Sequence, residues 1–397
     1  MPYVIKARLS NAQYREGGSN EILFPLSRDD YPGEIQRLGE LQAGDAVRQD
    51  CMAEEIDSPY EVLQCLRWQA VNVDELDYLA RRLESFDKYE VEQFQAACSA
   101  FLCLSVKDLI NMTFCCQGTT VISDLSKLEK AGKAHYLAIH GGAAPADEME
   151  DLDGGALAQE LIKSGKGKLT PYGLFFQNGV LLEDLYEGHS FPPFLRVDQQ
   201  AELELTKSDG TKSVIYLPFA ESEWDRFLQR ENIPDASECK QALHLYLGQG
   251  ECIALNGDVA ELEEWNKLCD TLSVMPHHRQ QAFAAALEVT DAEDVSQMRL
   301  LAASLEDFDL VPGVRDAESY GKYMIQESGK YRYDPDLECY YNYEALGEFL
   351  MTHEAGQITS QGYLKCEEGS AFLDFFTQDS PEQGHSQGEQ SMQMGGI

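Results

Sequence analysis

The N-terminal part of the chain begins with a pattern of alternating apolar and polar positions. Residues 3–9 and 22–26 each alternate in this way and predict two strands, and the Gly-Gly-Ser-Asn run at 17–20 is typical of a turn. Residues 29–38 then carry the apolar spacing of a short helix. We therefore expect a β-hairpin that is followed by a helix.

The same order of patterns returns after residue 200. Residues 201–205 and 214–219 predict two strands on either side of a Ser-Asp-Gly turn, and residues 221–230 predict a helix. Pro25 of the first hairpin and Pro218 of the second are 193 positions apart. A correspondence of this kind suggests that the chain contains an internal repeat.

Helical spacing continues the correspondence beyond the hairpins. Residues 74–86 place Leu76, Leu79 and Leu83 on one face of a helix, and residues 259–272 repeat this pattern. Further helices are expected around 94–97, 105–111, 283–286 and 291–303. The matched residues, whose offsets lie between 186 and 193, include Pro25 and Pro218, Tyr31 and Trp224, Glu75 and Glu261, Phe94 and Phe283, and Ala156 and Ala345. We expect two copies of about 190 residues.

These patterns predict an α+β fold that forms an elongated tandem repeat. Each half is expected to hold a small antiparallel β-hairpin module, a helical block and a short β/α module. In the first copy these modules are residues 1–70, 71–140 and 141–189. A Pro-bearing linker at 190–198 leads to the second copy, with modules at 199–257, 258–330 and 331–377 and a polar, disordered tail at 378–397.

The charge of the chain is strongly negative. The 397 residues include 31 basic and 69 acidic side chains, which gives a net charge of −38. Such acidity argues against direct binding to nucleic acid or to an anionic membrane, and it favours a basic protein partner. Duplex DNA carries one charge per roughly 1.7 Å, so this charge would match about 65 Å of duplex.

Many of the acidic residues fall at or near predicted helix starts. Helix capping explains the first one or two of each group, because carboxylates favour the positive end of the helix dipole. Capping does not explain why so few lysines lie four residues away, where they could form ion pairs with these acids. An array that imitates phosphates explains both features, and its candidate residues are Asp74, Asp77, Glu84, Glu221, Glu223, Asp225, Glu261, Glu263, Glu264, Glu293, Asp294, Glu306, Asp307, Glu338, Glu344 and Glu348.

The most informative stretch runs from Leu337 to Leu350. It has the pattern Leu-x-x-Tyr-x-x-Tyr-Glu-x-x-Gly and leads into an amphipathic helix on which Leu346, Phe349 and Leu350 share one face. This pattern resembles the C-terminal signature of the ArdA antirestriction proteins. Those proteins are acidic DNA mimics, carried by mobile genetic elements, that inhibit type I restriction-modification enzymes.

The resemblance covers nearly all of residues 1–376, in two copies, with departures from the family pattern. Asn342 and Glu348 occupy positions where the family usually has Asp and Arg. Residues 149–155, the matching stretch of the first copy, contain no tyrosine. The three tyrosines of the signature are expected to pack the third module or a subunit contact, and these are Tyr340, Tyr341 and Tyr343.

The resemblance implies a cytoplasmic inhibitor without catalytic activity. Its expected partner is the basic DNA-binding groove of a type I restriction-modification enzyme, and the two copies would pair within one chain as a pseudo-dimer or between chains as a homodimer. A DNA mimic directed at another target, such as a CRISPR effector or a DNA-binding regulator, stays open as an alternative.

An alternative of another class is a cysteine-dependent enzyme. The chain has 11 cysteines without Cys-x-x-Cys spacing, which argues against a disulfide framework or a zinc site. Cys98 and His135 could form a thiol–imidazole pair, but small core residues are the more common use of buried cysteines. No cofactor, metal ion or catalytic residue is expected.

Overall fold

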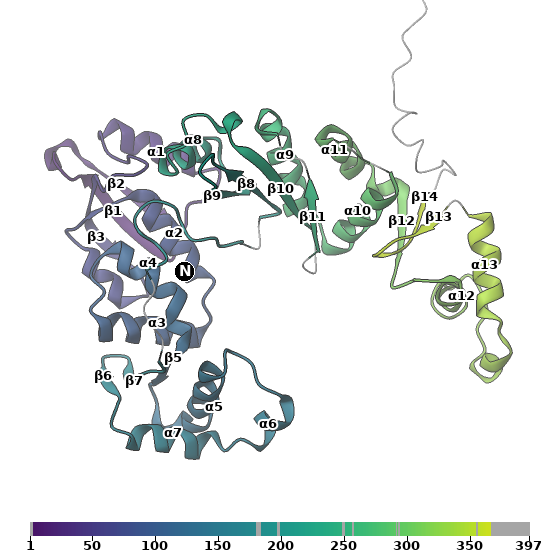
Figure 1. Cartoon of the computed structure of the whole chain (residues 1–397), viewed down its shortest axis with the longest axis horizontal. Coiled ribbons are helices and arrows are strands. Elements are labelled where there is room, and N and C mark those ends of the chain that lie inside the picture. The colour runs from purple at the N-terminus through teal and green to yellow at the C-terminus, as the bar shows by residue number, and fades with distance from the viewer. Residues whose placement is uncertain are drawn as a thin grey trace, which may run out of the picture. The chain divides into compact units, whose positions relative to one another are not determined.

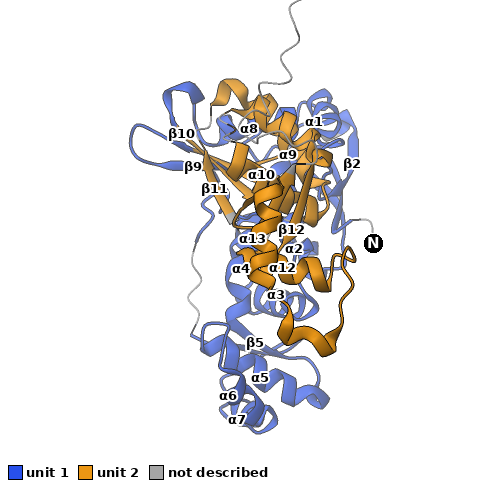
Figure 2. Cartoon of the chain, turned by 90° about the vertical axis from the view of Figure 1, so that its right-hand side faces the viewer, with its two compact units in different colours: residues 1–196, 205–215, 219–240 blue, residues 197–204, 216–218, 241–397 orange. Residues whose placement is uncertain are grey.

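The computed structural model describes residues 3–179, 184–196, 199–247, 251–255, 258–290, 292, 294–354 and 356–366. The predicted tail at 378–397 lies outside these residues. The chain forms two compact units, which Figure 2 shows in blue and orange. Unit 1 comprises residues 1–196, 205–215 and 219–240, and unit 2 comprises residues 197–204, 216–218 and 241–397.

Unit 1 contains two antiparallel sheets and the helices that cover them (Figure 1). The four-stranded sheet has the order β2-β1-β3-β4, and the three-stranded sheet has the order β5-β7-β6. The strands are β1 (Ile5–Asn11), β2 (Ser19–Phe24), β3 (Cys51–Asp57), β4 (Ala70–Val71), β5 (Thr119–Ile122), β6 (Lys168–Thr170) and β7 (Gly173–Gln177). The helices are α1 (Tyr31–Glu40), α2 (Val73–Glu84), α3 (Lys88–Phe101), α4 (Val106–Cys115), α5 (Leu128–Ile139), α6 (Ala146–Asp151), α7 (Gly154–Lys163) and α8 (Glu221–Arg230).

The main core of unit 1 lies between the four-stranded sheet and helices α2, α3 and α4. Strand β1 alternates as the sequence predicts, so Ile5, Ala7 and Leu9 face this core. Helix α2 contributes Leu76, Leu79 and Leu83, which are the three leucines expected on its buried face. The hairpin, the helix after it and the buried face of α2 are therefore confirmed.

The boundary between the two units falls inside two strands, β8 (Ala201–Thr206) and β9 (Lys212–Leu217), so each strand has residues in both units. These strands belong to a sheet of order β11-β10-β8-β9. Unit 2 continues with β10 (Lys240–Leu247), β11 (Glu251–Leu255), α9 (Leu262–Ser273), α10 (His277–Thr290), α11 (Val295–Ala303), β12 (Phe308–Pro312), α12 (Ala317–Gln326), α13 (Tyr343–His353), β13 (Gly356–Ile358) and β14 (Gly362–Cys366). Its three-stranded sheet has the order β12-β14-β13.

The α+β class is confirmed by these small antiparallel sheets and the many helices around them. The orders β2-β1-β3-β4 and β9-β8-β10-β11 describe the same connectivity, and so do β5-β7-β6 and β12-β14-β13. The tandem duplication and the module boundaries remain predictions.

Helix α13 differs from the expected amphipathic helix in the face that it buries. Phe349 is 58% exposed, whereas Tyr343 and Gly347 are the buried residues of this helix. A Cβ atom on Gly347 would lie 1.8 Å from the backbone oxygen of Ala317 in α12. The two helices approach so closely that glycine and backbone atoms form the contact. Leu350 packs against the core of unit 2, so the prediction of a buried Leu346–Phe349–Leu350 face is wrong only at Phe349.

Candidate functional site

Most of the predicted carboxylates of unit 2 lie on its surface. Glu264 is partly buried, and Glu293 lies outside the described residues. The fully exposed members of the set are Glu261, Glu263, Asp294, Glu306, Asp307, Glu338, Glu344 and Glu348. In unit 1, Glu84, Glu221 and Asp225 are exposed as well.

Helix starts account for the position of several of these acids. The Asp294 side chain accepts a hydrogen bond from the backbone N–H of Gln297 at 2.8 Å and caps α11. Glu344 lies in the first turn of α13, which Asn342 caps through the N–H of Ala345 at 3.1 Å. These carboxylates therefore lie at helix N-termini because they stabilise the start of the helix. Their side chains are also exposed to solvent.

Residues 258–307 form a segment of strongly one-sided charge. The sequence there holds 11 acidic and 3 basic residues. Lys267 lies 2.6 Å from Glu263 and 3.0 Å from Glu264, Arg299 pairs with Glu264, and Arg279 lies 3.8 Å from Glu306. Each of the three cations thus already has an acidic neighbour, and most of the negative charge of this segment is left unbalanced.

Three predicted carboxylates of the set do not lie on the surface. Asp74 and Asp77 in α2 are 9% and 5% exposed, and the Glu223 side chain in α8 is 25% exposed. Asp77 accepts hydrogen bonds from the backbone N–H of Leu26 and from Nε of Arg81, both at 2.6 Å. Because these groups are engaged within unit 1, we remove all three from the residues that could meet a partner.

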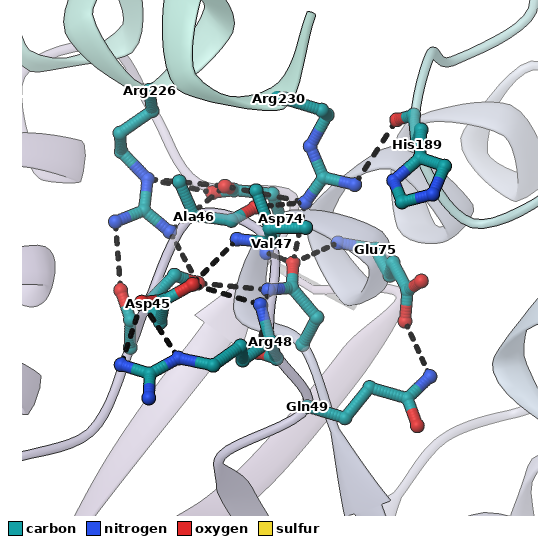
Figure 3. Close-up of polar contacts among 12 residues, drawn as sticks. Asp45, Ala46, Val47, Arg48, Gln49, Asp74, Glu75, His189, Arg226 and Arg230 are labelled. Atoms are coloured by element: carbon teal, nitrogen blue, oxygen red, sulfur yellow. Dashed lines mark hydrogen bonds and ion pairs between the residues drawn. The ribbon is translucent and has the colours of Figure 1, made fainter. Parts of the chain in front are cut away.

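Asp74 is instead the centre of a buried arginine cluster, shown in Figure 3. The Arg226 guanidinium of α8 donates to both carboxylate oxygens of Asp74, with Nε–Oδ1 at 3.2 Å and Nη2–Oδ2 at 2.8 Å. Its remaining donors reach the backbone oxygens of Gly44, at 2.7 Å, and Asp45, at 3.2 Å. Tyr31 completes the shell by donating its hydroxyl to Asp74 Oδ1 at 2.6 Å.

Arg230 lies one turn further along α8 and is 6% exposed. It donates to the backbone oxygen of Ala46, to Asn72 Oδ1 at 2.8 Å and to the Tyr186 hydroxyl at 3.0 Å. Asn72 is the N-cap of α2, and its side-chain oxygen also accepts from the N–H of Asp74 at 3.0 Å. Both arginines of α8 therefore bind side chains at the N-terminus of α2.

The segment 184–196 is held by the same cluster. The Tyr186 hydroxyl donates to Glu75 Oε1 at 2.8 Å, and Arg230 lies 4.3 Å from the ring of Phe191. Phe191 stacks on Tyr78, with ring centroids 4.5 Å apart, and the Tyr78 hydroxyl donates to the backbone oxygen of Pro192. Phe191 and Pro192 of the predicted linker at 190–198 thus pack against α2.

Burial changes the protonation of the groups around this cluster. Desolvation raises the pKa of Glu223 to about 7, although Arg81, 4.0 Å away, acts in the opposite direction. Burial and the Asp74 carboxylate together raise the pKa of Tyr31 well above its usual value. Because these residues are engaged with one another inside unit 1, they offer no acid–base pair to a substrate.

Two groups that the sequence suggested for chemistry are not brought together. His135 Nδ1 lies 3.0 Å from Thr120 Oγ1, whereas the Cys98 thiol is buried in the main core of unit 1. In the described part of the chain, no group of three or more His, Cys, Asp or Glu side chains is placed to hold a metal ion. Within the same residues, none of the helices has the length and apolarity that a membrane crossing requires.

Arg226 and Arg230 are the residues that sequence analysis missed. The available signal was their i,i+4 spacing on one helix in a chain that is poor in basic residues. Nothing local indicated that their partners lie more than 150 positions earlier.

Comparison with known proteins supports the resemblance in the second half of the chain. The family model of the antirestriction protein ArdA matches residues 250–365. This range holds the acidic segment 258–307 and the signature at 337–350. A search of curated proteins finds no match to the chain.

Proposed function

We propose that this protein is an antirestriction protein that acts as a DNA mimic and occupies the DNA-binding groove of a type I restriction-modification enzyme. The observation that carries the proposal is the ArdA family match over residues 250–365. The exposed acids of the same range are the groups that would stand in for phosphates, and the apolar cores beneath them would fix their spacing.

The partner-facing set is the predicted one without its buried members. It comprises Glu84, Glu221, Asp225, Glu261, Glu263, Glu264, Asp294, Glu306, Asp307, Glu338, Glu344 and Glu348, with Glu293 retained from the sequence alone. Binding through these groups would depend on charge complementarity and weaken as salt rises, because mobile ions screen exposed charges beyond about 10 Å at 0.1 M.

We further propose that the chain is a tandem duplication of one ArdA-like unit, so that one chain acts as a pseudo-dimer. The equal strand orders of the two pairs of sheets support this proposal. So do two helix pairs that meet at glycine. A Cβ on Gly132 would lie 1.8 Å from the backbone oxygen of Gly154, and one on Gly321 would lie 1.9 Å from that of Tyr343, with both positions shifted by 189.

The test is displacement of labelled DNA from a purified type I methyltransferase core. We expect full displacement by the protein at low salt, a steady loss of displacement as salt is raised, and a stoichiometry of one chain per groove. Two chains per groove would support a homodimer in place of the pseudo-dimer. Absence of displacement at low salt would contradict the proposed target, and the same assay with a CRISPR nuclease would then test the alternative.

A further inference from the structure

Three thiols gather where α3 ends. Cys98 lies in the last turn of α3 and is 2% exposed, and Cys103 follows the helix and is partly exposed. Cys65, in the 3-10 helix Glu61–Leu66, is partly exposed as well. All three are free thiols, and the proposed DNA-mimic function uses none of them.

The backbone brings two of these thiols together. Leu102 has left-handed backbone angles (φ 58°), which turn the chain back on itself directly after α3. The N–H of Cys103 then donates to the backbone oxygen of Cys98 at 3.0 Å. The Cys103 side chain also packs against the core cluster that contains Cys98. This turn therefore brings the two cysteines close together without help from a distant part of the chain.

The two thiols differ in pKa and in exposure, and a thiol–disulfide exchange reaction requires both differences. The neighbouring Cys98 thiol lowers the pKa of the Cys103 thiol, and burial raises the pKa of the Cys98 thiol. The thiolate is the nucleophilic form of cysteine, so Cys103 is the group that attacks. It is also the more exposed of the two, and its neighbours Leu102 and Leu104 are 74% and 59% exposed.

We propose that Cys98 and Cys103 are a redox-active pair that forms a reversible disulfide by exchange with a low-molecular-weight disulfide such as glutathione disulfide. The Cys103 thiolate attacks one sulfur of the small disulfide, its S–S bond breaks, and one small thiolate leaves. Cys98 gives up its proton to solvent, and its sulfur attacks the Cys103 sulfur and releases the second small thiolate. Two protein thiols are oxidised, and one small disulfide is reduced to two thiols.

The disulfide would close a covalent ring across the end of α3. This turn already holds two other contacts, since Lys168 Nζ donates to the backbone oxygen of Ala100 and Gln69 Nε2 donates to that of Leu104 at 3.0 Å. Oxidation would thus tighten a junction that joins α3 to the sheet of β5, β6 and β7 and to the 3-10 helix of Cys65.

Peptide mapping of the full chain tests this pair directly. Lys88 and Lys107 flank the turn, so trypsin leaves Cys98 and Cys103 in one peptide, 89–107. Cys65 falls in another peptide, 49–67, together with Cys51. After incubation with glutathione disulfide and alkylation of the remaining thiols, we expect peptide 89–107 to lose two hydrogens and to resist alkylation until it is reduced. The buried thiol of Cys269 serves as the internal control and should remain alkylatable after unfolding.

The variants identify the role of each sulfur. Cys98→Ser should stop at a mixed disulfide between Cys103 and glutathione, because the resolving thiol is missing. Cys103→Ser should leave the peptide unmodified. A cross-link between peptides 49–67 and 89–107 would assign the disulfide to Cys65 or Cys51 and overturn the proposal. Full alkylation of both cysteines in the treated wild-type protein would overturn it as well, and this readout needs no variant to fold.

Discussion

Arg226 donates hydrogen bonds to both carboxylate oxygens of Asp74, although the two residues are 152 positions apart in the chain. Their side chains are about one-tenth exposed, at 11% and 10%. A buried ion pair of this kind contributes little by comparison with an apolar pair, but removing one partner leaves a charge stranded in a poor solvent. The stability of unit 1 therefore depends on the contact that α8 makes with Asp74.

Arg226→Met should destabilise unit 1 by about 2–3 kcal/mol, because Asp74 would keep only Tyr31 and the more distant Arg230. Urea unfolding followed by circular dichroism measures this loss. Arg37→Met is the matched control, since Arg37 lies 60% exposed in a surface pair with Glu34 and should cost less than about 0.5 kcal/mol. Equal stability of the two variants would show that the Asp74 contact is dispensable.

Glu223→Gln should stabilise the protein at pH 8 and have a smaller effect at pH 5. The folded pKa of Glu223, about 7, lies above its unfolded value, so between these values the folded state binds more protons than the unfolded state. Wild-type stability therefore carries a penalty that grows as pH rises toward the folded pKa, and the neutral glutamine avoids it. Gln retains an oxygen that can accept the N–H of Ala220.

The size of this effect should be about 1–2 kcal/mol at pH 8, after allowance for the lost attraction to Arg81. Denaturant unfolding of both proteins at the two pH values measures it. A stability difference that stays constant between pH 5 and pH 8 would be incompatible with a raised pKa.

Gly347→Ala should destabilise unit 2 by about 1–3 kcal/mol. The added methyl group would meet the backbone oxygen of Ala317 at 1.8 Å, so α12 and α13 would have to move apart. Gly39→Ala in α1 is the matched control, because open space surrounds that position and alanine favours the helix by about 0.5–1 kcal/mol. Thermal unfolding should thus move in opposite directions for the two substitutions.

Reversal of charge at Glu344 and Glu348 should weaken inhibition of the type I enzyme. Both side chains are exposed on α13, and two lysines there would face a basic groove. We expect the concentration for half-displacement of DNA to rise by about tenfold at low salt, since two reversed contacts would cost about 1.4 kcal/mol together.

The control for this prediction carries the same change of charge outside the family match. Glu150→Lys with Asp151→Lys alters two exposed acids of α6 in the first half of the chain. Inhibition that is unchanged by the α13 substitutions would remove Glu344 and Glu348 from the partner-facing set. An equal loss in both variants would mean that total charge, and not position, governs binding.

Local patterns predicted the elements well. The helix at 221–230 matches α8 at both ends, and the three leucines of α2 face the core as expected. Such features depend on nearest neighbours along the chain, which a sequence displays directly.

The errors arose where a distant segment decides the environment. Asp74 has the sequence context of a solvated helix start, and only the return of α8 buries it. Phe349 has the spacing of a core residue, but the approach of α12 at Gly347 turns another face of α13 inward. The partner-facing acids stay a prediction, because the surface that would receive them belongs to another molecule.

The passage of the chain between its units limits how the protein can be divided. Unit 1 takes α8 from beyond residue 218, and unit 2 takes residues 197–204 and 216–218 from before it. A cut at the predicted linker would remove Arg226 and Arg230 from Asp74, and a cut after residue 240 would leave parts of unit 2 on the wrong fragment. No single cleavage point yields two intact units, so the contribution of each unit must be measured by substitution in the full chain.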